Sequence, residues 1–184
     1  MKIPEVLIDD ELDRLLAVPN VRYPTGKRNR ALMGIMAYSG LRVSEALNLK
    51  TGDIDFNTGK LTVKNGKNSK DRILWIGERP LAWIKAWLEV RPPGNGPLFT
   101  TLKGGPVNKR YVGAMVHRAA DKSGIRKNVH PHTLRHSFAT NLYQQTKDIR
   151  LVQKMLGHAS LDMTMIYTHI IDADAEAAMK ALGA

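Results

Sequence analysis

The sequence predicts one mainly α-helical domain of the α+β class, with a small antiparallel sheet in its front third. Apolar residues recur at helical spacing over most of the 184 residues, whereas residues 53–76 show short β-branched and apolar runs between turn residues. The chain has 43% hydrophobic residues, which suits a globular domain with its own core. No internal repeat or low-complexity linker divides it.

Three helices are expected before the sheet. Asp9 or Asp10 can cap the first helix, whose apolar stripe consists of Leu12, Leu15 and Leu16. A second helix is expected over about 26–39. Gly40 follows it and can adopt the left-handed conformation that ends helices. A short third helix is expected in "VSEALNL", residues 43–49.

The predicted sheet lies in "DIDFNTGKLTVKNGKNSKDRILWI", residues 53–76. Asn-Thr-Gly and Asn-Gly-Lys-Asn-Ser are typical turn sequences, and the runs between them favour two or three antiparallel strands. The rest of the chain is predicted to be helical, apart from an irregular connection at "RPPGNGP". The expected helices are 80–90, 107–124, 133–145, 148–156 and about 161–169, followed by a helical tail over 172–183.

The charge of the chain points to a polyanionic partner. A net charge of +11 and a pI near 10.0 favour nucleic acid, because neutralised phosphates release condensed counterions. A ribosome-associated or otherwise basic protein is the alternative. The absence of cysteine excludes disulfides, thiolate zinc sites and a cysteine nucleophile. No apolar run reaches the roughly 18 residues of a membrane span, and the N-terminus lacks a signal-peptide core, so a cytoplasmic protein is expected.

The segment "HPHTLRHSFATNLY", residues 130–143, gathers histidines around an arginine. His132, Arg135 and His136 have the spacing of one helix face, near a helix N-terminus that favours anions. A metal site is one alternative, because His132 and His136 are four residues apart. No acidic residue lies nearby, however, and Arg135 would repel a cation. Capping or core packing is the alternative for His130 and His136.

A second arginine has a distinctive position in "AYSGLRVSEALNLKTGDID". Arg42 falls at the junction of two predicted helices, where its rigid guanidinium group could be presented inward. A surface arginine at a helix end is the simpler alternative. Glu45 could support Arg42, or it could be an ordinary carboxylate at a helix start.

Five segments in order, "SGLRVSE", "GKNSKDR", "PHTLRHSFAT", "LGH" and "MIYTH", resemble the catalytic domain of the tyrosine recombinases, the phage integrase family. The similarity extends over essentially the whole chain. It is strongest to chromosome-dimer-resolving recombinases and to integron or transposon integrases. The resemblance implies a mainly helical catalytic domain with a small three-stranded antiparallel sheet. It also implies that DNA strands are cleaved and rejoined through a 3′-phosphotyrosine intermediate, with no metal ion, ATP or other cofactor.

The resemblance also implies the catalytic residues. Arg42 and Arg135 match the two catalytic arginines, and His132 matches the histidine of the H-x-x-R box. His158 matches the later histidine, and Tyr167 matches the nucleophile.

The catalytic lysine of the family lies in the hairpin turn, which points to Lys67. The family often has glycine directly after this lysine, whereas this chain has Asn68. Lys64 and Lys70 therefore stay open as alternatives.

These residue types suit attack on a phosphodiester. Two arginines can bind the nonbridging oxygens through charge-assisted hydrogen bonds. A tyrosine phenol has a pKa of about 10, so nearby cations are needed to favour the phenolate, and His132 could accept its proton. A hairpin lysine could protonate the departing 5′-oxygen, and His158 could donate a hydrogen bond to the phosphate.

The expected partner is a double-stranded DNA recombination site. Positively charged side chains that are expected to contact its backbone are Lys27, Arg28, Arg30, Lys70, Lys103, Lys109, Arg110 and Arg118. A solvated surface position is the alternative for each of them. A homo-oligomer on DNA, from dimer to tetramer, is expected, with the tail 172–183 either packing into a neighbour or folding back.

Members of the family usually carry a separate N-terminal helical domain, but only 41 residues precede Arg42. Residues 1–184 are therefore expected to form a single catalytic domain, either a fragment or a naturally short member, of prokaryotic, phage or mobile-element origin. Two other functions stay open. One is a catalytically silent DNA-binding or regulatory module, and the other is a nicking and resealing enzyme resembling type IB topoisomerases.

Overall fold

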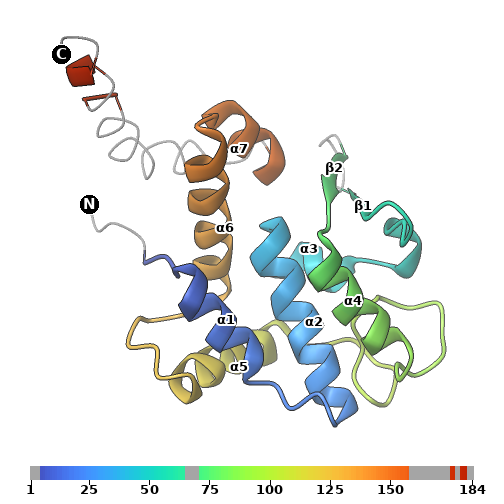
Figure 1. The fold of residues 1–184 in the computed structure, drawn as a ribbon. Coiled ribbons are helices and arrows are strands. Elements are labelled where there is room, and N and C mark those ends of the chain that lie inside the picture. The colour runs from blue at the N-terminus through green and yellow to red at the C-terminus, as the bar shows by residue number, and fades with distance from the viewer. Residues whose placement is uncertain (1–4, 65–70, 158–174, 177–178, 182–184) are drawn as a thin grey trace.

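The computed structural model describes residues 5–64, 71–157, 175–176 and 179–181 (Figure 1). Within these residues it confirms a mainly helical domain with a small antiparallel sheet. The elements are α1 Asp9–Ala17, α2 Pro24–Ser39, α3 Val43–Asn48, a 3₁₀ turn Thr51–Asp53, β1 Lys60–Val63, β2 Arg72–Trp75, α4 Glu78–Leu88, α5 Lys109–Lys122, α6 Pro131–Thr146 and α7 Ile149–Leu156.

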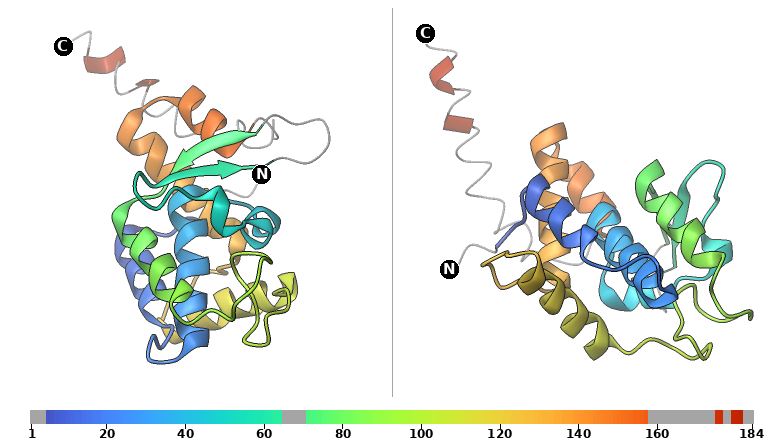
Figure 2. Two further views of the ribbon diagram at one scale, coloured as in Figure 1. Left: turned by 90° about the vertical axis from the view of Figure 1, so that its right-hand side faces the viewer. Right: turned by 60° about the horizontal axis from the view of Figure 1, so that its bottom comes forward.

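Helix α2 lies at the centre, with α1, α4 and α6 packed around it (Figures 1 and 2). It begins at Pro24, two residues before the expected start, because proline suits the first helical position, where no N–H partner is needed. It ends at Gly40 as predicted, with a φ of 62°. A side chain at this position would also collide with the Phe138 ring of α6. Gly40 therefore allows α2 to stop while α6 passes close to its end.

The sheet has two strands in the described residues, not the expected three. Strands β1 and β2 pair antiparallel, with Lys60 opposite Trp75 and Val63 opposite Arg72. The expected first strand contributes only an isolated bridge from Ile54 to Leu61. Asp55 accepts hydrogen bonds from the backbone of the turn that follows, so the chain reverses before it can extend the pairing.

Alternation along β2 places Arg72 and Leu74 on the buried face and Ile73 and Trp75 on the exposed face. An arginine thus occupies a position where a core residue would be expected.

Two clusters of buried apolar residues occur in the part of the chain that the structure describes. The larger one includes α1–α5 and the sheet, with Trp87 and Phe99 among its fully buried side chains. The smaller one joins Ala139 and Tyr143 of α6 to Val152 and Leu156 of α7. Helix α6 contributes Leu134 to the larger cluster, so its N-terminal part is held by the main core and its C-terminal part by α7.

The remaining helix predictions are confirmed with small shifts of their bounds. Helix α6 begins at Pro131, two residues before the expected start, and α7 is capped by Asp148, whose carboxylate accepts from the Leu151 N–H. The expected helix 161–169 lies outside the described residues. In the tail, the described residues 175–176 and 179–181 are helical and exposed.

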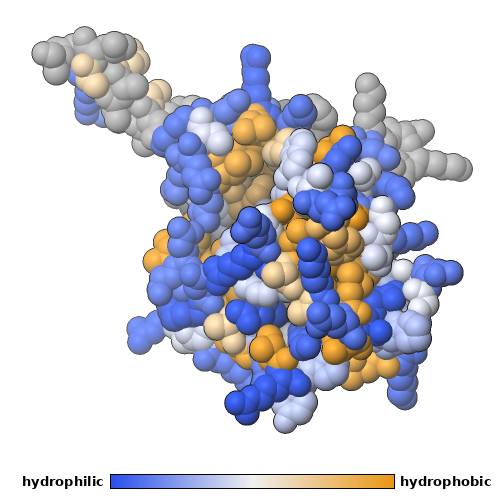
Figure 3. Space-filling view, turned by 45° about the vertical axis from the view of Figure 1, so that its right-hand side comes forward, coloured by the Kyte–Doolittle hydropathy of each residue, from blue (hydrophilic) through white to orange (hydrophobic). Residues whose placement is uncertain are grey.

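None of the described helices is long and apolar enough to cross a membrane. Hydrophilic side chains cover most of the face in Figure 3, with apolar side chains exposed in patches between them.

Candidate active site

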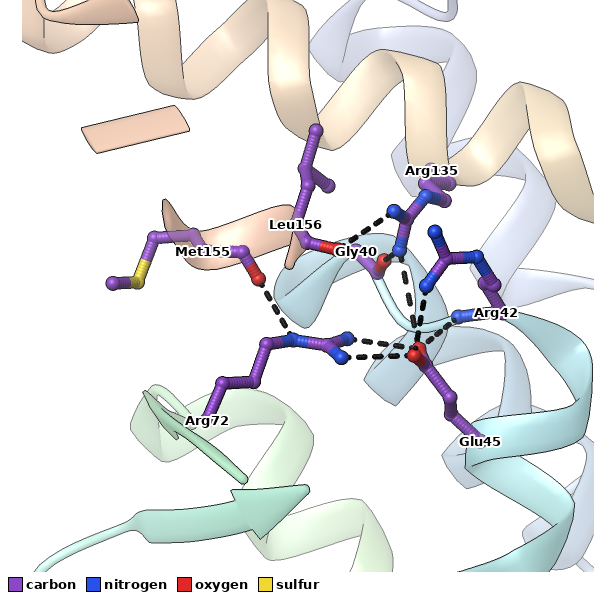
Figure 4. Close-up of polar contacts among 7 residues, drawn as sticks. All are labelled: Gly40, Arg42, Glu45, Arg72, Arg135, Met155 and Leu156. Atoms are coloured by element: carbon purple, nitrogen blue, oxygen red, sulfur yellow. Dashed lines mark hydrogen bonds and ion pairs between the residues drawn. The ribbon is translucent and has the colours of Figure 1, made fainter. Parts of the chain in front are cut away.

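The start of α3 fixes Arg42 through Glu45, which lies one turn further along the helix (Figure 4). The Glu45 carboxylate accepts a hydrogen bond from the Arg42 backbone N–H at 2.7 Å and another from Arg42 Nη1 at 3.0 Å. The first bond satisfies a backbone donor that has no partner at a helix start. One carboxylate thus holds both the backbone and the side chain of Arg42, so both alternatives considered for Glu45, a support for Arg42 and a carboxylate at a helix start, apply.

Arg72 reaches the same carboxylate from strand β2. Its two terminal nitrogens each donate to one Glu45 oxygen at 2.8 Å, which is a bidentate pair. Its Nε donates to the Met155 carbonyl oxygen near the end of α7 at 3.0 Å. The Arg72 side chain is 7% exposed. It therefore joins β2, α3 and α7 inside the molecule.

Arg135 completes the group from α6. Its Nη1 donates to the Gly40 carbonyl oxygen at 2.5 Å, and its Nη2 donates to the Leu156 carbonyl oxygen at 2.8 Å. Nη1 also lies 3.9 Å from a Glu45 oxygen. We call Arg42, Glu45, Arg72 and Arg135 the Glu45 cluster.

The Glu45 cluster places three guanidinium groups around one carboxylate, which leaves a formal excess of two positive charges. Burial by itself would raise the pKa of Glu45. Hydrogen bonds from Arg72 and from the Arg42 backbone, together with their positive charges, lower this pKa to about 2. Glu45 is therefore ionised at neutral pH. Arg42 is the most exposed of the three arginines, at 32%, against 7% for Arg72 and 6% for Arg135.

His132 lies on the same helix as Arg135 and is exposed. Its pKa is lowered by loss of hydration, and then by the charges of His130, Arg135 and Arg42. A lowered pKa makes the neutral imidazole the main form at pH 7, and this form can accept a proton. The pKa of His136 is lowered for similar reasons, but this residue is half-buried. Among the described residues, no three histidine or acidic side chains come together in a group that could hold a metal ion.

Only one of the three candidate lysines lies within the described residues. Lys64 Nζ forms an ion pair with the buried Asp53 at 2.7 Å, next to a cavity of about 300 Å³ lined by Ser44, Asn48 and Lys50. Lys67 and Lys70 lie outside the described part of the chain, as do His158 and Tyr167.

The basic residues that were expected to contact DNA have different environments. Arg28 is buried and donates to the Thr100 carbonyl, to Asn29 and to the Tyr111 hydroxyl. Arg30 lies over the Trp83 ring, 4.6 Å from its centroid. Both guanidinium groups are engaged in internal contacts. Lys27 is half-buried, whereas the exposed residues of the predicted set are Lys103, Lys109, Arg110 and Arg118.

Arg72 is not among the site residues that the motifs predict. It is the last residue of "GKNSKDR", the segment that contains the predicted catalytic lysine. A signal was available, because Arg72 has the same strand phase as Leu74 and Ile76, both of which are buried. A buried guanidinium group needs hydrogen-bond acceptors for its N–H groups, and for Arg72 the Glu45 carboxylate supplies them on one side.

The described residues thus form a helical domain with a central helix, a small sheet and a cluster of three arginines around one carboxylate. Comparison with known sequences identifies the protein family. Residues 5–174 match the phage integrase family. The chain belongs to this family.

Its relatives include tyrosine recombinases of bacteria. XerC of Xylella fastidiosa (strain 9a5c) is 38% identical over 170 residues, with 92% of this chain and 57% of XerC covered. XerD of Ralstonia nicotianae (strain ATCC BAA-1114 / GMI1000) is 36% identical over 175 residues, again with 92% of this chain and 57% of XerD covered. The chain thus spans little more than half the length of these relatives.

Solved structures show the same fold. A crystal structure of XerA recombinase superposes with a TM-score of 0.83 at 33% identity, covering 98% of this chain and 66% of XerA. The site-specific recombinase XerH, bound to a palindromic difH substrate after cleavage, gives a TM-score of 0.80 at 34% identity. This match covers 100% of this chain and 54% of XerH.

Proposed function

We propose that residues 1–184 form the catalytic domain of a tyrosine-type DNA strand transferase, which cleaves and rejoins double-stranded DNA at a recombination site. The observation that carries this proposal is the Glu45 cluster. It brings Arg42 and Arg135, which are 93 positions apart in the sequence, to one carboxylate. Membership of the phage integrase family and the similarity to XerC, XerD and XerH support the same function.

In the proposed reaction, the Tyr167 hydroxyl attacks the scissile phosphate. A bond forms between the phenolic oxygen and phosphorus, and the bond from phosphorus to the 5′-oxygen breaks. The products are a 3′-phosphotyrosine and a free 5′-hydroxyl. Arg42 and Arg135 stabilise the charge that builds up on the nonbridging oxygens, and His158 donates a hydrogen bond to the phosphate.

Proton transfer is assigned to His132 and Lys67. Because the pKa of His132 is lowered, its neutral imidazole can accept the phenolic proton. Lys67 supplies a proton to the departing 5′-oxygen. The ion pair between Lys64 and Asp53 favours Lys67 or Lys70 over Lys64 for this role, because Lys64 is already held by a carboxylate.

We assign affinity for the DNA backbone chiefly to Lys103, Lys109, Arg110 and Arg118, which are exposed and basic. Rejoining needs no ATP, because the energy of the phosphodiester bond is kept in the phosphotyrosine. Positive side chains take the role that a metal ion has in other phosphoryl-transfer sites, so the reaction is proposed to be metal-independent. Assembly of several copies on DNA, through the tail 172–183, completes the proposal.

The test is covalent capture on nicked duplex DNA. A pool of duplexes with a randomised central sequence and one nick is incubated with the protein in EDTA, and adducts are separated on denaturing gels. The nick releases a short strand after attack and so prevents rejoining. We expect an adduct with the wild type, and mass spectrometry should locate the phosphotyrosine in the peptide that contains Tyr167. Tyr167→Phe should form none.

Tyr23→Phe serves as the matched control, because Tyr23 is an exposed tyrosine outside the Glu45 cluster. It should form the adduct at the wild-type level. An adduct that persists in Tyr167→Phe would contradict the assignment of the nucleophile. DNA binding without any adduct would favour a silent DNA-binding module, and relaxation of supercoiled DNA without strand exchange would favour a topoisomerase-like enzyme.

A further inference from the structure

We infer that Arg72 is a positioning residue of the active site, which locks the start of α3, strand β2 and the end of α7 into one geometry. This inference rests on the proposed function and adds a residue to it that has no assigned role there. Arg72 does not act on the phosphate itself. It acts through Glu45 on Arg42, and through Met155 on the end of α7.

Arg72 donates a hydrogen bond from each of its three guanidinium nitrogens. Nη1 and Nη2 bind the two oxygens of Glu45, and Nε binds the Met155 carbonyl on the opposite side (Figure 4). The group is planar, so these three bonds fix the relative orientation of Glu45 and the Met155 carbonyl. Lysine has one nitrogen at the end of a flexible chain and cannot reproduce this geometry.

The end of α7 is held by two arginines at neighbouring carbonyls. Arg72 binds the carbonyl of Met155, and Arg135 binds that of Leu156. Gly157 follows, with a φ of 75°, and a side chain there would lie 3.3 Å from Arg72 Nη1. The positive φ favours glycine at this position, and a side chain would also require the Arg72 guanidinium group to shift slightly. This packing fixes where the chain leaves α7, one residue before His158 in the sequence.

Arg72 is linked through its contacts to the surroundings of both proposed catalytic arginines, and it follows the proposed catalytic lysine in the sequence. Arg42 is held through Glu45, Arg135 shares the end of α7 with Arg72, and Arg72 itself follows Lys67 by five positions in the chain. At 7% exposure, Arg72 has little surface to offer to DNA. A change at Arg72 should therefore affect the chemical step and leave DNA affinity nearly unchanged.

The experiment compares Arg72→Lys with Arg91→Lys. Arg91 is a suitable control, because its guanidinium group also binds backbone carbonyls, those of Leu98, Pro92, Gly94 and Pro97, outside the Glu45 cluster. Single-turnover cleavage is measured at saturating concentrations of the nicked duplex that the wild type cleaves, and DNA affinity is measured separately. We expect Arg72→Lys to cleave on the order of 100-fold more slowly with an unchanged Kd, because small displacements of reacting groups have effects of this size. Arg91→Lys should cleave like the wild type.

Chemical rescue provides a second variant. Arg72→Ala leaves a space for a free guanidinium ion, so guanidinium chloride below denaturing concentrations should restore part of its cleavage rate. Sodium chloride at equal ionic strength should not, and neither salt should accelerate the wild type. A cleavage rate of Arg72→Lys equal to that of the wild type, or equal losses in Arg72→Lys and Arg91→Lys, would overturn the inference while leaving the proposed function intact.

Hydrogen exchange tests the inference without any reaction. In free protein, backbone amides of α7, residues 149–156, should exchange faster in Arg72→Lys than in the wild type, and should be unchanged in Arg91→Lys. If the wild type forms no covalent adduct, the proposed function fails, and this measurement still decides whether Arg72 holds α7. Unchanged exchange in Arg72→Lys would overturn the inference.

Discussion

The described residues contain two groups of arginines that differ in the chemical groups they contact. In the Glu45 cluster, a carboxylate and three backbone carbonyls receive directed hydrogen bonds from Arg72 and Arg135. In the second group, which we call the Trp83 cluster, Arg30 and Arg79 lie over the Trp83 ring at 4.6 and 5.0 Å from its centroid. Arg79 also pairs with Asp13 of α1.

The two kinds of partner constrain the orientation of a guanidinium group to different degrees. A carboxylate and carbonyls fix the plane of a guanidinium group, whereas an aromatic ring attracts a cation over its face without fixing the direction of its N–H groups. The pKa of Arg30 is lowered by burial and by the charge of Arg79, so the proximity of the two arginines and the burial of Arg30 act against its charged form. A basic chain can therefore use some arginines to build a site and others to pack helices.

The largest difference between the two clusters is expected in the cleavage rate, when Arg135→Lys is compared with Arg30→Lys. Lysine keeps the charge but cannot bind the Gly40 and Leu156 carbonyls and the phosphate at once. We expect a loss of cleavage on the order of 10²–10³-fold, which is typical when one preorganised donor to a transition state is removed. Single-turnover adduct formation measures it. Arg30→Lys, in the Trp83 cluster, should keep more than about a tenth of the wild-type rate, and equal losses in both variants would remove the distinction between the clusters.

Glu45→Gln tests the charge at the centre of the first cluster. Because the pKa of Glu45 is lowered from 4.5 to about 2, its ionisation stabilises the folded state by about 3 kcal/mol. This stabilisation is fully present above pH 4.5 and is lost as the pH falls from 4.5 towards 2. Glu45→Gln should therefore lower the free energy of unfolding at pH 7 by about 3 kcal/mol.

The same variant should lose part of the pH dependence between pH 4.5 and 2, which urea denaturation at a series of pH values can follow. A stability of Glu45→Gln that varies with pH as steeply as that of the wild type would show that another carboxylate is responsible.

The smallest effect is expected in the Trp83 cluster. Trp83→Leu removes the ring on which Arg30 and Arg79 pack, and should cost about 1–2 kcal/mol of unfolding free energy. Thermal denaturation measures the loss. The cleavage rate at temperatures well below the transition should stay at the wild-type level, since the ring contacts of Trp83 are with Arg30, Arg79 and Tyr38, outside the Glu45 cluster. A selective loss of cleavage in a folded Trp83→Leu protein would contradict the separation of the two clusters.

Much of the fold was predictable because the signals are local. Gly40 ends α2 where expected, and the helices from α4 to α7 lie within a few residues of the predicted bounds. The prediction of a third strand was wrong. The apolar residues of this segment resemble those of β1, but the hydrogen bonds of Asp55 turn the chain after a single bridge.

The candidate site was predictable only in part. Arg42, His132 and Arg135 were chosen from motifs, and the structure brings both arginines to Glu45. The roles of Lys67, His158 and Tyr167 stay predictions, as those residues lie outside the described part of the chain. Arg28 and Arg30 were expected at the DNA surface on charge alone, and charge does not say whether an arginine points inward.

The sequence by itself determined which segments are helical, where α2 stops and which segments belong to the family, because helical periodicity, glycine stops and motifs depend on neighbours within a few residues. It did not determine every helix start: the expected cap Asp9 or Asp10 lies within α1, which is preceded by Ile8. Only the tertiary structure decided that Arg72 is buried and that Glu45 joins it to Arg42 and Arg135. The physical reason is that a buried guanidinium group must find acceptors for its N–H groups wherever the fold supplies them, and Arg72 finds its carboxylate 27 positions away in the sequence.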